Sequence, residues 1–126
     1  SLAKNFPNAN IVLEHAGMLE HDSPAGRAAW AEGLKRLAEN ANVSTKFSGL
    51  GTFVQRCDPA GIASIIGEVV AIFGAERCLF GSNFPIEKLW TSYADLIGAH
   101  RAALAPFSKA EQRAILHDNA ARIYRL

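Results

Sequence analysis

The chain has 126 residues, of which 49% are apolar and 20% charged, as expected for a globular domain of ordinary composition. Its net charge of +1 gives no electrostatic basis for binding nucleic acid or an anionic membrane, and no apolar run approaches the roughly 20 residues that cross a bilayer. The two cysteines, Cys57 and Cys78, lack the spacing of a metal site, so we expect reduced thiols in a cytoplasmic protein.

The first predicted strand covers residues 10–15, after an opening segment that has the pattern of a helix tail. Side chains alternate across a strand, which places His15 on one face with Leu13 and Glu14 on the other. Because a helix tail is an unusual start for a domain, we expect residues 1–126 to be a single partial domain that is a piece of a longer chain.

The predicted helices begin with recognisable signals. Ser23 and Asp58 are N-cap residues that are followed directly by proline, and Ser108 with Glu111 forms a capping box. Apolar side chains at helical spacing continue from these starts, and Gly74 marks one of the ends. The predicted helices cover residues 24–41, 59–73, 92–104, 108–116 and 119–126.

Two further strands are predicted between these helices, at residues 43–48 and 77–82. The first of them has an apolar face and a polar face formed by Ser44, Lys46 and Ser48. This pattern suits a barrel in which the polar faces line the interior and helices cover the outside. The alternation of strands and helices predicts an α/β fold with parallel strands.

Each predicted strand ends in polar residues and carries a glycine at its end. The ends read Glu-His-Ala-Gly at residues 14–17, Lys-Phe-Ser-Gly at 46–49 and Phe-Gly-Ser-Asn-Phe-Pro at 80–85. Parallel strand–helix units present their chemistry at the C-terminal ends of the strands. We therefore expect His15, Lys46 and Asn83 to face a common cavity.

Four segments in this order resemble the amidohydrolase-related family of metal-dependent-hydrolase-like (β/α)8 barrels, and most closely its lactonase branch. They are Ile-Val-Leu-Glu-His-Ala-Gly at residues 11–17, Lys-Phe-Ser-Gly-Leu at 46–50, Leu-Phe-Gly-Ser-Asn-Phe-Pro at 79–85 and Asp-Asn-Ala-Ala-Arg-Ile-Tyr-Arg-Leu at 118–126. The resemblance implies the C-terminal half of a TIM barrel, without the first four strand–helix units and their His-x-His strand. It also implies hydrolysis of a lactone, or of a related ester or amide, as a small-molecule substrate. The site would then be completed by the missing half-barrel or by self-association.

The resemblance assigns roles to two strand-end residues. The family has a metal-binding histidine at the end of its fifth strand, matched by His15, and an aspartate that acts as general base at the end of its eighth, matched by Asn83. A carboxamide cannot take a proton as a carboxylate does, and it is a weaker metal ligand. The resemblance therefore implies either one divalent metal, zinc or manganese, held by His15, or a metal-free reaction of the kind found in the lactonase branch.

Lys46 and its neighbours complete the predicted site. An ammonium group inside a strand must be paired if it is buried. Lys46 therefore either forms a salt bridge inside the barrel, with a carboxylate of the missing half, or holds a substrate carboxylate or carbonyl. The catalytic candidates are His15, Lys46 and Asn83, and the substrate-binding candidates are Lys46, Asn83, Ser48 and Arg27. Glu87 either contacts the substrate or is a surface charge, and we interpret it as a surface charge.

Two interpretations of the function stay open at this point. His15 is either a site residue or a hydrogen-bonded core histidine. The chain is either part of a hydrolase or a non-catalytic α/β module that keeps the fold for binding or assembly. Asn83 and the missing His-x-His strand favour the second interpretation.

Overall fold

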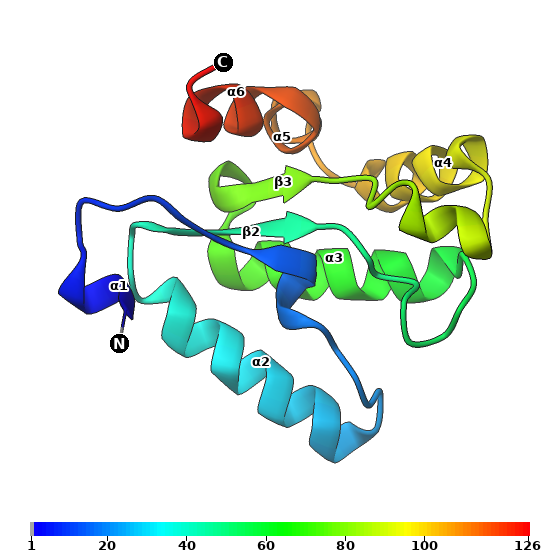
Figure 1. The fold of residues 1–126 in the computed structure, drawn as a ribbon, viewed down its shortest axis with the longest axis horizontal. Coiled ribbons are helices and arrows are strands. Elements are labelled where there is room, and N and C mark those ends of the chain that lie inside the picture. Colours follow the sequence, from blue (N-terminus) through cyan, green and yellow to red (C-terminus); the bar gives the residue numbers. More distant parts are fainter. Residues whose placement is uncertain (1) are drawn as a thin grey trace.

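The computed structural model describes residues 2–126, which contain one sheet of three parallel strands. The strands are β1 (Ile11–Leu13), β2 (Val43–Phe47) and β3 (Cys78–Phe80), and they lie in the order β1-β2-β3 (Figure 1). Ile11 pairs with Val43, and Thr45 pairs with Cys78. The predicted α/β class and the parallel direction of the strands are confirmed.

Helices connect the strands and follow the last of them. They are α1 (Leu2–Asn5), α2 (Pro24–Ala38), α3 (Pro59–Phe73), α4 (Tyr93–Leu104), α5 (Lys109–Arg113) and α6 (Asn119–Tyr124). The Ser23 hydroxyl caps α2 by accepting from the amide of Gly26, and the Ser108–Glu111 capping box is present at α5. None of the helices described in residues 2–126 combines the length and the apolar character needed to cross a bilayer.

Helix α2 ends three residues before the predicted end at residue 41. The Asn40 side chain explains the stop, because its Nδ2 donates to the carbonyl oxygens of Arg36 and Leu37, each at 3.2 Å. These two carbonyls belong to the last turn of the helix, where helical acceptors run short of amide donors. The backbone amide of Asn40 also donates to the carbonyl oxygen of Leu37, at 3.0 Å. Arg77 stabilises the connection between α2 and β2, because its side chain donates to the carbonyl oxygens of Ala38, Asn40 and Val43.

The main core lies between the sheet and the helices α2 and α3. Val43, Phe47 and Cys78 of the strands are buried there against Leu34 of α2 and a row of apolar side chains on α3. The row consists of Ile62, Ile66, Val69, Val70 and Phe73. Helices α5 and α6 lie beside β3, away from α2 (Figure 1).

Buried polar groups fasten α6 to the start of β3. Asn119 is 1% exposed, and its Nδ2 donates to the carbonyl oxygens of Ala75 at 2.7 Å and Cys78 at 2.8 Å. Arg122 bonds the carbonyl oxygen of Glu76 at 2.6 Å and the Oδ1 atom of Asn119 at 3.3 Å. These bonds fix the start of β3 and, through the strand, the position of its C-terminal end.

The strand numbers taken from the resemblance are wrong for at least one of the two matched residues. His15 follows β1 and Asn83 follows β3, and β2 alone lies between these strands in the sheet. The two residues are therefore two strand positions apart, whereas the ends of a fifth and an eighth strand are three apart. If Asn83 follows the eighth strand of a barrel, His15 follows the sixth.

The buried thiol of Cys78 makes the stability of the fold sensitive to alkali. Burial raises the pKa of Cys78 from 9.0 to about 12. Because the folded-state pKa lies above the unfolded value, this stabilisation is complete below pH 9 and is lost as the pH rises toward 12. We expect the free energy of unfolding to fall by about 1 kcal/mol between pH 8 and pH 10 from this group, measured by urea denaturation.

Two cysteine variants separate this effect from the titration of other groups. Cys78→Ala should flatten most of the slope between pH 8 and pH 10, whereas Cys57→Ala, at the less buried cysteine, should keep it. An equal slope in the unmodified chain and in Cys78→Ala would show that the thiol is not the cause.

Candidate active site

The three segments that follow the strands lie at one edge of the sheet, because parallel strands end on the same side (Figure 1). They are Glu14–Gly17 after β1, residues 48–56 after β2 and residues 81–85 after β3. Pairing continues past β3, since the amide of Gly81 donates to the carbonyl oxygen of Phe47 at 3.0 Å. The structure thus brings the predicted strand ends to a common edge.

His15 meets Ser48 across the ends of β1 and β2. The Nδ1 atom of His15 lies 2.7 Å from the Oγ atom of Ser48. Strand β1 ends at Leu13, two residues earlier than predicted, because His15 and Ala16 adopt left-handed backbone angles, with φ of 57° and 49°. This turn directs the imidazole of His15 toward β2. The face of His15 was predicted from strand alternation, which no longer applies once β1 has ended.

Glycine is required at position 49 to seat the imidazole. Gly49 has a φ of +63°, and a Cβ atom there would lie 2.8 Å from the Nδ1 atom of His15. Real Cβ atoms do not approach another atom so closely, and the backbone angle is one that other residues rarely adopt. The glycine that follows Ser48 therefore belongs to the site.

The contact with Ser48 selects one tautomer of His15. Ser48 is 2% exposed, and its hydroxyl has no other hydrogen-bond partner in the described part of the chain. Buried donors are almost always satisfied, so the consistent arrangement has the hydroxyl donating to Nδ1. The proton of the neutral imidazole is then on Nε2, which becomes a hydrogen-bond donor.

Lys46 is paired within the chain. Its Nζ atom lies 2.7 Å from the Oε1 atom of Glu14, so the two side chains share one face of the sheet. This corrects two expectations, that Glu14 lies on the opposite face and that a missing segment supplies the carboxylate. Burial lowers the pKa of Lys46, but the hydrogen bond and the negative charge of Glu14, helped by Tyr124, raise it by more.

The lack of a side chain at Gly81, just after β3, leaves room for this lysine. A Cβ atom on Gly81 would lie 3.0 Å from the Cδ atom of Lys46 and 3.1 Å from the Cβ atom of Ser48. Gly81 therefore lets the side chains of β2 lie over the end of β3. Lys46 and Ser48 are neighbours on that face, as the alternation of β2 predicts.

Asn83 follows β3 and bonds to a residue that was interpreted as a surface charge. Glu87 is 1% exposed, which makes that interpretation wrong. Its Oε1 atom accepts from Nδ2 of Asn83 at 3.3 Å, and its Oε2 atom accepts from Nε1 of Trp90 at 2.7 Å. Glu87 lies in the one-turn 3-10 helix η3 (Ile86–Leu89), which is too short for a periodic pattern to mark a buried carboxylate. The sequence signal for its burial was the amide of Asn83 and the indole of Trp90, four and three residues away.

Arg27 does not join the other candidates. Its guanidinium bonds Glu68 at 2.9 Å, Asp22 at 3.0 Å and Ser64 at 2.7 Å, and it lies over the ring of Trp30. Three of its nitrogens are engaged in this way. In the structure the residue fastens α2 to α3 on the helical side of the sheet.

His15 also borders a small hollow that is otherwise mostly apolar. Its lining consists of His15, Ala16, Met18, Leu19, Trp30, Gly49, Leu50, Phe53 and Ile65. Lys46 and Asn83 are not part of this lining. The structure therefore joins His15 to Ser48 and Lys46 to Glu14 at one edge, while Asn83 is held separately by Glu87.

A metal centre is not formed by the described residues alone. Zinc sites in proteins use at least three protein ligands, and residues 2–126 contain no cluster of three histidine, cysteine or acidic side chains suited to a metal. The lone pair on Nδ1 of His15 is taken by Ser48 in the arrangement above, and Nε2 carries the proton. Residues 2–126 therefore do not provide a complete set of metal ligands by themselves.

The sequence matches the amidohydrolase family over residues 1–126. It is 39% identical over 125 residues to the uncharacterized protein y4mH of Sinorhizobium fredii, with 99% of this chain aligned to 42% of that protein. It is 32% identical over 127 residues to an L-fucono-1,5-lactonase of Burkholderia multivorans, with 92% of this chain aligned to 43% of that enzyme.

Solved structures agree with these relatives. An amidohydrolase from Burkholderia multivorans with bound zinc superposes with a TM-score of 0.91 at 27% identity, covering 99% of this chain and 47% of that one. Amidohydrolase 2 from Bifidobacterium longum subsp. infantis has a TM-score of 0.70 at 25% identity, covering 99% of this chain and 44% of that one. The chain thus spans less than half the length of the proteins it matches.

Proposed function

This chain belongs to the amidohydrolase family, and from that premise we propose that it forms the C-terminal half of a (β/α)8 barrel hydrolase acting on a lactone or a related ester or amide. Its three parallel strands with their helices, and its superposition on 47% of a zinc-bound amidohydrolase, support the barrel. The lactonase-named relative at 32% identity supports the substrate class.

The barrel proposal requires a second segment. Three strands cannot close a barrel, so the outer edges of β1 and β3 need partners, and the face that carries Lys46 needs a cover. The partner is either the rest of a longer chain or another copy of this one. Sedimentation of residues 1–126 should show self-association or a poorly folded chain, and a compact, stable monomer would count against the proposal.

The contact between His15 and Ser48 carries the proposed mechanism. With Ser48 donating to Nδ1, the Nε2–H group of His15 donates to the carbonyl oxygen of the substrate and stabilises the charge that develops as water adds to the carbonyl carbon. The ring C–O bond of the tetrahedral intermediate then breaks, and the leaving oxygen takes a proton that originates from the attacking water. The product is the open hydroxy acid.

Lys46 and Asn83 have supporting roles in this proposal. Lys46, held by Glu14, provides a fixed positive charge for a substrate carboxylate or carbonyl. The carboxamide of Asn83 orients the attacking water by a hydrogen bond but cannot take its proton. Because the donors of residues 2–126 do not form a metal site, we assign no step to zinc or manganese.

A chimeric protein tests the proposal. In this chimera, residues 1–126 replace the aligned region of the zinc-bound Burkholderia multivorans amidohydrolase, chosen because the two superpose with a TM-score of 0.91. Hydrolysis is followed with L-fucono-1,5-lactone and a panel of other lactones. A chimera that folds but hydrolyses none of them would favour the non-catalytic module instead.

Removing the Ser48 hydroxyl should lower turnover without removing the catalytic group. Ser48→Ala leaves the imidazole free to change tautomer and to rotate, and misplacing a reacting group by about 1 Å can cost about 100-fold in rate. We expect such a fall in kcat for the chimera. Ser44→Ala is the matched control, because Ser44 lies on the same face of β2 and is also buried. Equal rates in the two variants would remove Ser48 from the mechanism.

A further inference from the structure

We propose that Glu87 is a positioning residue that fixes the orientation of the Asn83 carboxamide, so that the amide presents its oxygen, and not its nitrogen, to the site at the strand ends. The inference rests on the proposed function, because it names what sets the polarity of one group in that site. Glu87 lies in the short 3-10 helix η3 (Ile86–Leu89) between β3 and α4.

The carboxylate of Glu87 is held between donors on both sides. Oε2 accepts from the indole of Trp90 at 2.7 Å, and Oε1 accepts from the amide nitrogen of Asn83 at 3.3 Å. The loop after β2 packs against it, since a Cβ atom on Gly51 would lie 3.3 Å from Oε2. With 1% of its surface exposed, Glu87 has little freedom to turn away.

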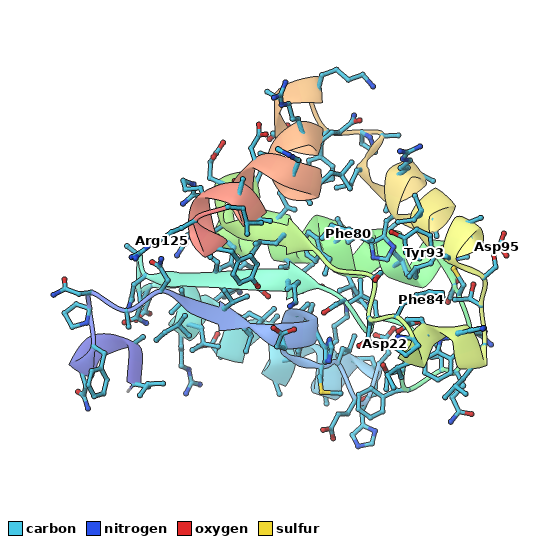
Figure 2. All side chains as sticks on the ribbon, turned by 45° about the horizontal axis from the view of Figure 1, so that its top comes forward. Asp22, Phe80, Phe84, Tyr93, Asp95 and Arg125 are labelled. Atoms are coloured by element: carbon cyan, nitrogen blue, oxygen red, sulfur yellow. The ribbon has the colours of Figure 1, made fainter. Side chains whose placement is uncertain are left out.

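The backbone and the neighbouring rings hold the same segment. The amide of Glu87 donates to the carbonyl oxygen of Asn83 at 3.2 Å, which closes a turn that begins with Asn83 at a φ of 53°. The next residue, Phe84, meets Tyr93 of α4 edge to face at 5.1 Å between ring centres (Figure 2). Asn83 is therefore presented by a turn that is fastened to α4.

The chemistry of the pair decides which way the carboxamide faces. A carboxylate accepts hydrogen bonds and donates none, so only the NH2 group of Asn83 can face Glu87. The oxygen Oδ1 is on the other branch of the amide and accepts no hydrogen bond within the described residues. Asn83 is only half-buried, so this oxygen can accept from a water or a substrate hydroxyl.

The same argument explains why position 83 holds an amide. An aspartate there would set two carboxylates about as far apart as Asn83 and Glu87 are now, and one of them would have to keep a proton. Glu87 thus favours asparagine over aspartate at the end of β3. The charge expected at position 83 is found at position 87.

Replacing Glu87 with glutamine should invert the Asn83 amide. Glutamine has one oxygen, and the indole of Trp90 can only donate, so that oxygen stays with Trp90, whose bond is the shorter. The NH2 group of the introduced glutamine then faces position 83, and Asn83 turns its oxygen inward and its nitrogen toward the site. Glu87→Gln changes the site from an acceptor to a donor with almost no change in shape.

The test uses four proteins: the unmodified form, Glu87→Gln, Asn83→Asp and the double variant. In the double variant the NH2 group of the introduced glutamine donates to the introduced aspartate. This restores an amide–carboxylate hydrogen bond, with the carboxylate now at position 83 and the amide at position 87. Glu39→Gln, at an exposed position, is the control for the loss of a carboxylate. The side-chain amide of Asn83 is followed by NMR in the chimera, and unfolding by urea, kcat and KM are measured in the same protein.

The expected results differ for each protein. Glu87→Gln shifts the Asn83 amide resonances and lowers kcat by up to about 100-fold with little change in KM, the loss expected when a reacting group is misplaced. Asn83→Asp has a lower urea midpoint, and its deficit grows as the pH rises from 5 to 8, because both carboxyl groups must then ionise. The double variant regains the midpoint and hydrolyses faster than Asn83→Asp.

Other titrating groups do not account for differences in the urea midpoint among the four proteins. The groups that feel the charge of Glu87 are His100 of α4 and Cys57 after β2, and both are present in all four proteins. Unchanged amide resonances in Glu87→Gln, or a double variant no more stable than Asn83→Asp, would overturn the assignment. If the unmodified chimera hydrolyses no lactone, the proposed function fails, and NMR and unfolding still decide the role of Glu87.

Discussion

His15→Asn lowers kcat for lactone hydrolysis in the chimera by about 10²-fold to 10³-fold, the loss typical when one donor to a developing oxyanion is removed. Asparagine is chosen because His15 has a φ of 57°, and asparagine tolerates this left-handed angle better than alanine. The shorter side chain cannot replace the Nε2–H group. The variant therefore removes the imidazole and keeps the turn after β1.

A second histidine provides the control for this prediction. His117 is largely exposed, and its Nδ1 atom lies 2.8 Å from the Oδ1 atom of its neighbour Asp118, so His117→Asn should leave kcat unchanged. Circular dichroism and urea unfolding establish that each variant is folded before rates are compared. If His15→Asn retains the kcat of the unmodified chimera, His15 has no part in the mechanism, and the interpretation as a hydrogen-bonded core histidine stands.

Asn119→Ala should lower the free energy of unfolding of the chimera by about 2–4 kcal/mol. The substitution leaves the carbonyl oxygen of Cys78 without the Asn119 donor, and an unsatisfied buried group costs about 1–3 kcal/mol. The carbonyl oxygen of Ala75 loses the same donor but keeps the bond from the backbone amide of Cys78. Arg122 also loses its contact with Oδ1 of Asn119. Because the bonds join α6 to the start of β3, the effect should appear as a lower urea midpoint for the whole domain.

Asn8→Ala is the matched control, because Asn8 is exposed and should change the stability little. A loss below about 1 kcal/mol in Asn119→Ala would mean that water or a rearranged side chain satisfies the carbonyl oxygen of Cys78. In that case the ties between α6 and β3 would not be what holds the strand in place.

Most of the fold could be predicted from the sequence because its signals are local. Ser23 and Ser108 cap helices as predicted, and the order of strands and helices gives a parallel sheet. Asp58 precedes α3 as predicted, but its side chain makes no capping hydrogen bond. The errors lie where a side chain overrides the periodic pattern. Asn40 ends α2 by bonding its last carbonyls, and the left-handed turn at His15 shortens β1.

The site was less predictable, because it depends on pairings between distant segments. Alternation along β2 correctly placed Lys46 and Ser48 on one face, but the pairing of Lys46 with Glu14 depends on the register between β1 and β2. The burial of Glu87 depends on Trp90 and on the loop after β2. Arg27 stands near the end of β1 in the sequence, yet its partners are on α3 and in the loop before α2.

The initial rate of lactone hydrolysis by the chimera tests most directly whether the strand ends of this chain complete a hydrolase site. It is measured beside the rates of residues 1–126 alone and of the Burkholderia multivorans amidohydrolase without its aligned region. We expect turnover in the chimera and no rate above the uncatalysed background in either part. A folded chimera that is no faster than its separate parts would contradict the account.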